Sequence, residues 1–113
     1  MVRIGPKNPS GFVYIVAAEG APPGPPYYTK IGCSPKSFDD ANGRGFFARF
    51  WIEALGLGKL RVDEVFHANA YELEHRVHAQ LLPTDGRGKS TEVFNIDFES
   101  AVALVKRYAQ EIF

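Results

Sequence analysis

The chain has a single cysteine among its 113 residues, which excludes an internal disulfide and a cysteine-based zinc site. Since the sequence assigns no base to Cys33, that residue is interpreted as a small filler side chain and not as a nucleophile. No run approaches the ~18 consecutive apolar residues of a membrane-spanning helix. Residues 1–10 contain no apolar block, so they do not resemble a signal peptide. We therefore expect a cytoplasmic protein.

A surplus of charge of either sign is also lacking. Thirteen Lys and Arg residues match thirteen Asp and Glu residues, which gives a formal net charge of +0. A dedicated nucleic-acid binder usually carries a basic surplus. The balance argues against tight, sequence-independent binding of nucleic acid by this domain alone, although a local basic patch is compatible with it.

The length fits one domain, because two would each be too small to bury a core. Residues 1–10 are expected to be a lead-in and residues 11–113 a single domain. Runs of β-branched and aromatic residues predict three main strands, and a proline-rich surface loop separates the first two. These strands are predicted at residues 11–18, 27–32 and 60–66.

Apolar residues at spacings of three and four predict three helices. The first covers residues 45–55, and the second covers residues 70–82 with Asn69 as N-cap and Glu72 completing a capping box. Asp97 is expected to cap the third helix, and residues 92–96 are expected to form a short strand or extended segment. The predicted fold is α+β, with a three-stranded central β-sheet flanked by helices.

Two triplets stand out on the first two strands. The segment Gly-Phe-Val-Tyr ends at Tyr14, and Lys-Ile-Gly begins at Lys30. Together they resemble the paired signature of the GIY-YIG nuclease superfamily, whose two triplets lie on adjacent strands. The second triplet begins with lysine, and in this it resembles the phage-type branch of the superfamily, where a lysine is common at that position. That branch has a downstream helix with a central glutamate, which residues 71–78 resemble through Glu74 and a histidine one turn later. Its closing element is resembled by residues 91–94.

The resemblance implies hydrolysis of phosphodiester bonds with one divalent metal, Mg²⁺ or Mn²⁺, bound by Glu74. By the same resemblance Tyr14 takes the proton of the attacking water. Because a phenol has a reference pKa near ~10, nearby cations have to lower it, and Lys30 is well placed to do so. Lys30 could equally orient the water or contact the phosphate. Most of the superfamily has a tyrosine there.

An arginine of the first helix would grip the phosphate through its fork-shaped guanidinium. Arg49 is the choice, and Arg44 is the alternative because it lies nearer the usual distance from the second triplet. Arg87 and Lys89 lie in a glycine-bearing loop that could contact a phosphate backbone or be simply solvated. Glu92 is expected to support the rim of the site.

Each of these catalytic assignments has a purely structural alternative. Tyr14 could be a packed aromatic, Lys30 a solvated charge at a strand end, and Glu74 part of a solvated helix face. His78, at i+4 from Glu74, could share the metal, but a hydrogen-bonding or packing role is favoured. No role follows for His67.

Three functions follow from these alternatives. The first is a metal-dependent endonuclease acting on nucleic acid, with DNA as the expected substrate. The second is a binding module for nucleic acid or protein that has the fold without the chemistry. The third is a nuclease subunit whose affinity for DNA comes from a protein partner or from homo-oligomerisation, which would reconcile a catalytic set with zero net charge.

Overall fold

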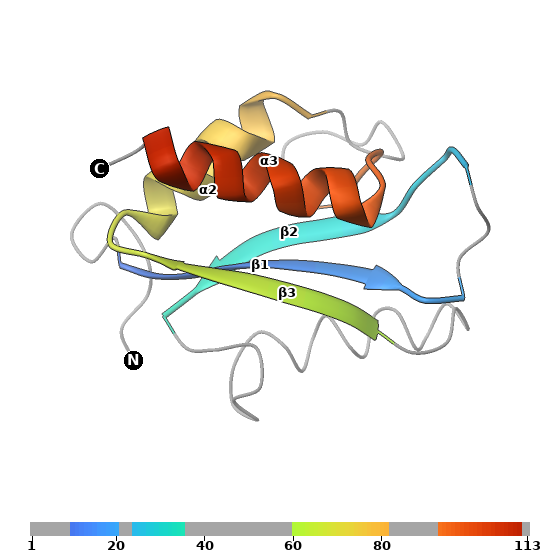
Figure 1. The fold of residues 1–113 in the computed structure, drawn as a ribbon, viewed down its shortest axis with the longest axis horizontal. Coiled ribbons are helices and arrows are strands. Elements are labelled where there is room, and N and C mark those ends of the chain that lie inside the picture. Colours follow the sequence, from blue (N-terminus) through green and yellow to red (C-terminus); the bar gives the residue numbers. More distant parts are fainter. Residues whose placement is uncertain (1–9, 21–23, 36–59, 82–92, 112–113) are drawn as a thin grey trace.

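The computed structural model of the chain describes residues 10–20, 24–35, 60–81 and 93–111. The helix predicted at residues 45–55 lies outside these ranges. The described elements form one antiparallel sheet and two helices, in the order β1, β2, β3, α2, β4, α3 (Figure 1). The predicted α+β class is therefore confirmed.

The sheet has four strands in the order β3-β1-β2-β4, so the prediction of three strands is wrong by one. The strands are β1 (Gly11–Ala18), β2 (Thr29–Ser34), β3 (Leu60–His67) and β4 (Val93–Phe94). The added strand is β4, which pairs with the first two residues of β2. β4 lies within residues 92–96, where the sequence predicted a short strand or an extended segment, and two residues are too few for an alternating pattern to decide between them.

Helices α2 (Ala70–Ala79) and α3 (Phe98–Glu111) cover the same face of the sheet (Figure 1). Helix α2 packs over β1 and β2, and α3 packs over β1 and β3. The core between the layers consists of buried side chains from every element but β3: Val13, Ile15, Ile31, Ala70, Leu73, Val77, Phe94, Ala101 and Val105. No helix in the described ranges has the length and apolarity that crossing a membrane requires.

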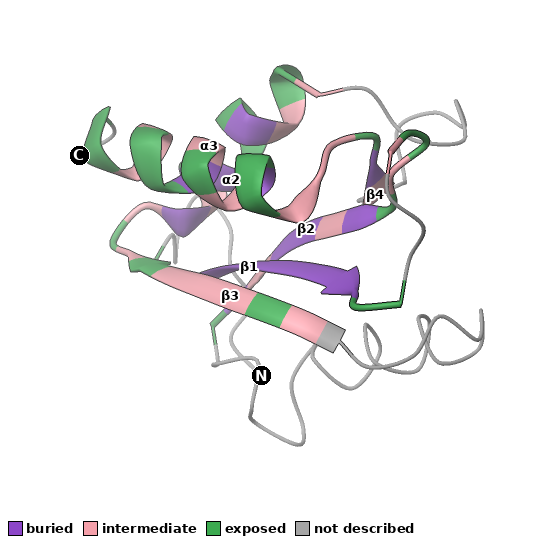
Figure 2. Ribbon diagram, turned by 45° about the vertical axis from the view of Figure 1, so that its right-hand side comes forward, coloured by how far each residue is buried: buried purple, intermediate pink, exposed green. Residues whose placement is uncertain are grey.

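The central strand β1 is buried at every residue except Phe12, which is half-buried, and most of the strand is coloured as buried in Figure 2. Val13 and Ile15 contribute to the core beneath the helices. Because successive side chains of a strand point to opposite faces, Tyr14 and Val16 point to the other face of the sheet. They are 1% and 0% exposed, so both faces of β1 are covered. This explains why its sequence is a continuous apolar run and not an alternating one.

Helix α2 begins at the predicted place but without the predicted capping box. Asn69 is the N-cap residue, yet its side chain makes no capping hydrogen bond. Its backbone N–H donates to Nδ1 of His67 over 2.8 Å, and Glu72 instead pairs with Arg76 over 2.8 Å. The helix ends at Ala79 and not at residue 82, because the next two backbone N–H groups bond to carbonyls three residues back and tighten the turn.

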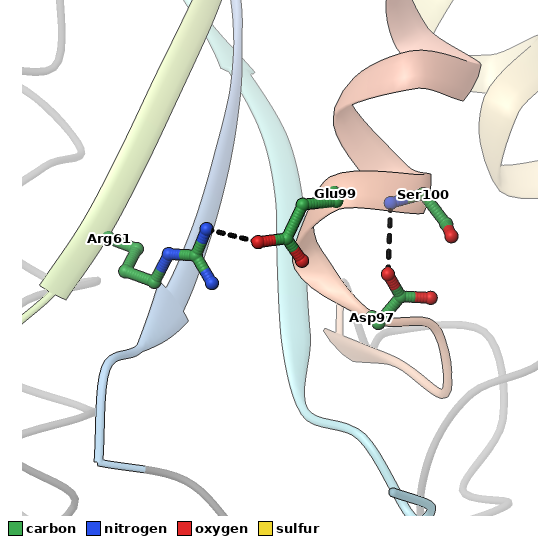
Figure 3. A network of polar contacts seen from close by, with 4 residues as sticks. All are labelled: Arg61, Asp97, Glu99 and Ser100. Atoms are coloured by element: carbon green, nitrogen blue, oxygen red, sulfur yellow. Dashed lines mark hydrogen bonds and ion pairs between the residues drawn. The ribbon is translucent and has the colours of Figure 1, made fainter. Parts of the chain in front are cut away.

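Helix α3 has the N-cap that the sequence predicts (Figure 3). A carboxylate oxygen of Asp97 accepts the backbone N–H of Ser100 over 3.1 Å, and the Asp97 carbonyl accepts the N–H of Ala101 over 2.9 Å. Hydrogen bonds from the side chain and backbone of Ser100 lower the pKa of the Asp97 carboxyl below its ordinary value. The first turn of α3 is thus stabilised by an ionised cap.

We expect Asp97→Ala to lower the free energy of unfolding by about 0.5–2 kcal/mol at neutral pH, because the Ser100 N–H loses its acceptor. The folded pKa of Asp97 lies below the unfolded one, so this stabilisation is present above the unfolded pKa. It is lost as the pH falls through the folded pKa, and the difference between parent and variant should narrow there. Urea unfolding at neutral and acidic pH measures both effects. Asp97→Asn, which keeps a capping oxygen, is the control; a parent-like Asp97→Ala at neutral pH would refute the cap.

Candidate functional site

Tyr14 and Lys30, the two residues that the paired triplets single out, lie on the same face of the sheet. In the register of β1 and β2, Tyr14 is opposite Gly32 and Val16 is opposite Lys30. Tyr14 and Lys30 are therefore diagonal neighbours, at the separation of roughly 7–8 Å that such positions have. Ile31, between Lys30 and Gly32, points to the helix-covered face and joins the core. The side that carries Tyr14 and Lys30 is thus the face opposite α2 and α3.

Tyr14 is nearly inaccessible, with 1% of the residue exposed. A phenol that accepts a proton from an attacking water has to come within hydrogen-bonding distance of that water. In this arrangement Tyr14 is a packed aromatic side chain, and Lys30 beside it is half-buried. Tyr14 and Lys30 are therefore neighbours. For catalysis, a water molecule would first have to reach the buried phenol.

Glu74 lies on the buried side of α2. It is 8% exposed, whereas Glu72, His75 and Arg76 of the same helix are exposed. The carboxylate of Glu74 has no hydrogen-bond or ion-pair partner among the residues that the structure describes. Burying a carboxylate without a partner is costly, and such groups are usually paired or bind a metal. Glu74 is therefore the described side chain best suited to hold a hard cation.

The position of α2 relates Glu74 to the two triplets. Helix α2 starts three residues after His67, which pairs with Gly11 at the first residue of β1. Strand β2 ends at this same end of the sheet, where Ser34 pairs with Phe12. Helix α2 thus begins at the end of the sheet where β2 ends, whereas the second triplet pairs with residues 14–16, nearer the other end of β1. Glu74 belongs to the helix that covers the face opposite Tyr14 and Lys30, and the described residues do not form one cleft containing all three.

His78 is engaged in packing and hydrogen bonding, as favoured from the sequence. Its Nε2 lies 2.9 Å from the carbonyl oxygen of Ile31, and its ring lies 4.7 Å from that of Phe94. Since a carbonyl only accepts, Nε2 carries the proton and is not available as a metal ligand. Within the described ranges no group of three or more His, Cys, Asp or Glu side chains could hold a metal ion.

The remaining predicted site residues lie outside the described ranges. They are the two candidate arginines, the rim glutamate and the two cations of the glycine-bearing loop: Arg44, Arg49, Glu92, Arg87 and Lys89. Their roles stay predictions.

His67, to which the sequence assigned no role, joins three elements. Its Nδ1 accepts the N–H of Asn69 over 2.8 Å, and its Nε2 lies 3.0 Å from the carbonyl oxygen of Ala109. A backbone N–H only donates and a carbonyl only accepts, so the imidazole is neutral with its proton on Nε2. His67 thereby fixes the end of β3 and the start of α2 against α3. The only sequence signal was a histidine at the end of a predicted strand.

Comparison with models of protein families, with curated proteins and with solved structures gives no significant match for this chain. The resemblance to a nuclease superfamily therefore depends on the residues quoted above and on their placement in the fold.

Proposed function

We propose that the chain is a GIY-YIG-type, metal-dependent endonuclease that hydrolyses phosphodiester bonds in nucleic acid, with DNA as the favoured substrate. The observation that carries this proposal is the placement of the two triplets. They occupy adjacent antiparallel strands at the centre of the sheet, and their Tyr14 and Lys30 are diagonal neighbours on one face. An arbitrary pair of strand residues would share a face only by chance of register.

Glu74 supplies the metal-binding carboxylate in this proposal. A buried carboxylate without a partner among the described residues suits a single Mg²⁺ or Mn²⁺ ion, which prefers oxygen ligands and keeps several waters. The ion, when bound, stabilises the negative charge that develops on the leaving oxygen. A position within a regular helix holds the carboxylate rigidly, which favours a defined geometry for the phosphate.

The pair on the other face supplies the proton acceptor. By the resemblance, Tyr14 accepts the proton of the attacking water and Lys30 contacts the phosphate, which requires that this pair and Glu74, on opposite faces of the described sheet, reach the same phosphate. Arg49, or Arg44 in its place, is proposed to hold the phosphate through paired hydrogen bonds.

A second candidate, a binding module without catalysis, has its own supporting observations. Tyr14 is 1% exposed, and the helix with Glu74 lies on the other face of the sheet. In that case the chain binds nucleic acid or another protein, and metal has no effect. A third possibility lies between the nuclease and the binding module: a nuclease subunit that needs a protein partner or a second copy of itself. The net charge of +0 favours this subunit over a chain that binds nucleic acid alone.

Incubation of the purified protein with supercoiled plasmid separates these functions. The nuclease should convert the plasmid to the nicked form with Mg²⁺ or Mn²⁺ and should leave it intact with EDTA. A binding module should retard DNA in a native gel equally well with and without EDTA, and should not cut it. Absence of cutting with either metal on plasmid, linear duplex, branched DNA and RNA would refute a stand-alone nuclease.

A further inference from the structure

A pocket of about 580 Å³ lies at the end of the sheet remote from α2. Its lining comes from the end of β1 at Ala18, the start of β2 at Thr29 and the start of α3 at Phe98. Figure 1 shows that these three ends lie on the same side of the molecule. The loop before β2 supplies one wall, with Pro25, Pro26 and two tyrosines. Because α2 starts at the opposite end of the sheet, this pocket is separate from Glu74; Thr29, which lines it, directly precedes Lys30 of the second triplet.

The loop wall is tied to the segment that precedes α3. The backbone N–H of Tyr27 donates to the side-chain oxygen of Asn95 over 2.8 Å, and the hydroxyl of Thr29 donates to the carbonyl of Ile96 over 2.6 Å. Both bonds join residues almost 70 positions apart in the chain. The two walls are therefore held together, and the pocket is formed before any ligand arrives.

The pocket is acidic. Among the described residues, three carboxylates, of Glu19, Asp97 and Glu99, line it together with one cation, Arg61. The hydrogen bond from Arg61 lowers the pKa of Glu99, and the bonds from Ser100 lower that of Asp97, so both are ionised at neutral pH. Asp97 also occupies the N-terminus of α3, which would otherwise attract an anion. These charges disfavour a phosphate-bearing ligand in the pocket.

The pocket already holds one guanidinium group, that of Arg61. It forms an ion pair with Glu99 (Figure 3) and lies 4.5 Å from the ring centroid of Phe98. A carboxylate and an aromatic face are the two groups that bind guanidinium best in proteins. The rest of the lining offers the same two kinds of group, the carboxylates of Glu19 and Asp97 and the rings of Tyr27 and Tyr28, and Tyr28 is 42% exposed.

We propose that this pocket docks an arginine-bearing, extended peptide segment of a partner protein. The guanidinium group of the segment lies against a tyrosine ring and pairs with Glu19 or Asp97, and the prolines contact its aliphatic stem. Charge complementarity in a preformed pocket favours this ligand, whether or not the chain is a nuclease. A basic partner held there would add the positive charge that a chain of net charge +0 lacks for binding DNA.

A titration of the ¹⁵N-labelled protein tests the proposal by NMR. The probe is an acetylated, amidated Pro-Arg-Pro-Arg peptide, and the comparison is Pro-Glu-Pro-Glu. The arginine peptide should shift amide signals of the pocket, including those of Tyr27, Tyr28 and Glu99, whereas the acidic peptide should not. The double variant Glu19→Gln/Asp97→Asn should weaken binding at least ~10-fold, because two of the three carboxylates lose their charge.

The matched control is Glu72→Gln/Glu111→Gln, which removes two exposed carboxylates elsewhere and should bind like the parent. Asparagine is as good an N-cap as aspartate, so the pocket variant should stay folded, and thermal unfolding verifies this. Equal shifts with both peptides, equal weakening in both double variants, or parent-like binding by the pocket variant would each overturn the proposal. Plasmid nicking by the pocket variant should equal that of the parent, so the outcome is distinct from that of the nuclease test.

Discussion

Replacement of Glu74 by glutamine should lower the rate of metal-dependent plasmid nicking by at least ~100-fold, since charge stabilisation by a bound metal contributes several kcal/mol. The amide has nearly the size of the carboxylate but carries no negative charge for the ion. Glu74 is 8% exposed and has no partner among the described residues, so the fold should tolerate the change. Removal of a buried charge should leave the melting temperature unchanged or raise it. Initial nicking rates with Mg²⁺ and with Mn²⁺, together with thermal unfolding, measure both effects.

Glu72→Gln is the matched control. Glu72 is on the same helix but is exposed, and it pairs with Arg76 across one turn. Exposed pairs of this kind contribute about 0.2–1 kcal/mol, so the variant should nick at the parent rate and lose little stability. A Glu74→Gln variant that is folded and fully active would show that the metal is not bound there. Equal losses in both variants would instead indicate a general effect of helix charge.

The elements with long, regular patterns could be predicted from the sequence. Residues 11–18 form the strand predicted there, because a buried central strand requires apolar side chains on both faces. Helix α3 begins directly after the predicted cap, Asp97, since an aspartate followed by helically spaced apolar residues specifies a start locally. Tyr14 and Lys30 could be placed on adjacent strands by the resemblance of the two triplets to a paired signature that lies on adjacent strands.

Features that depend on tertiary contacts could not be predicted. Strand β2 covers Thr29–Ser34 and not residues 27–32, because Tyr27 bonds to Asn95 in the loop before α3. The capping box at Asn69 is replaced by a contact with His67, which is itself held by Ala109. In both cases a partner distant in sequence decides the local geometry.

The candidate site shows the same division. The polar residues of α2, Glu72, Glu74, His75 and Arg76, predict a solvent-exposed helix face. The packing of α2 against the sheet buries Glu74 and leaves the other three exposed. The turn between β3 and α2 decides which face of the sheet α2 covers. This turn has only two residues, too few for a sequence pattern that predicts its direction. The acidic pocket is assembled from the ends of several elements, so no single stretch of sequence indicates it.

Leu73→Ala should be among the most destabilising substitutions in the described part of the chain, at about 2–5 kcal/mol of unfolding free energy. Leu73 is 0% exposed and packs with Val13 and Ile15 beneath α2, so its removal leaves a cavity between helix and sheet. Urea unfolding measures the loss, with Leu104→Ala as the control. Leu104 is only partly buried at the edge of the same core, and its truncation should cost less.

The two leucine variants also connect stability with activity. Leu73 precedes Glu74 on α2, so the cavity should loosen the helix turn that positions the carboxylate, and nicking should fall more in Leu73→Ala than in Leu104→Ala at a temperature where both are folded. Equal unfolding free energies for the two variants would contradict the packing of α2 described above. Unequal stability with equal nicking rates would mean that α2 stabilises the domain without positioning a catalytic group, which is the behaviour expected of a binding module.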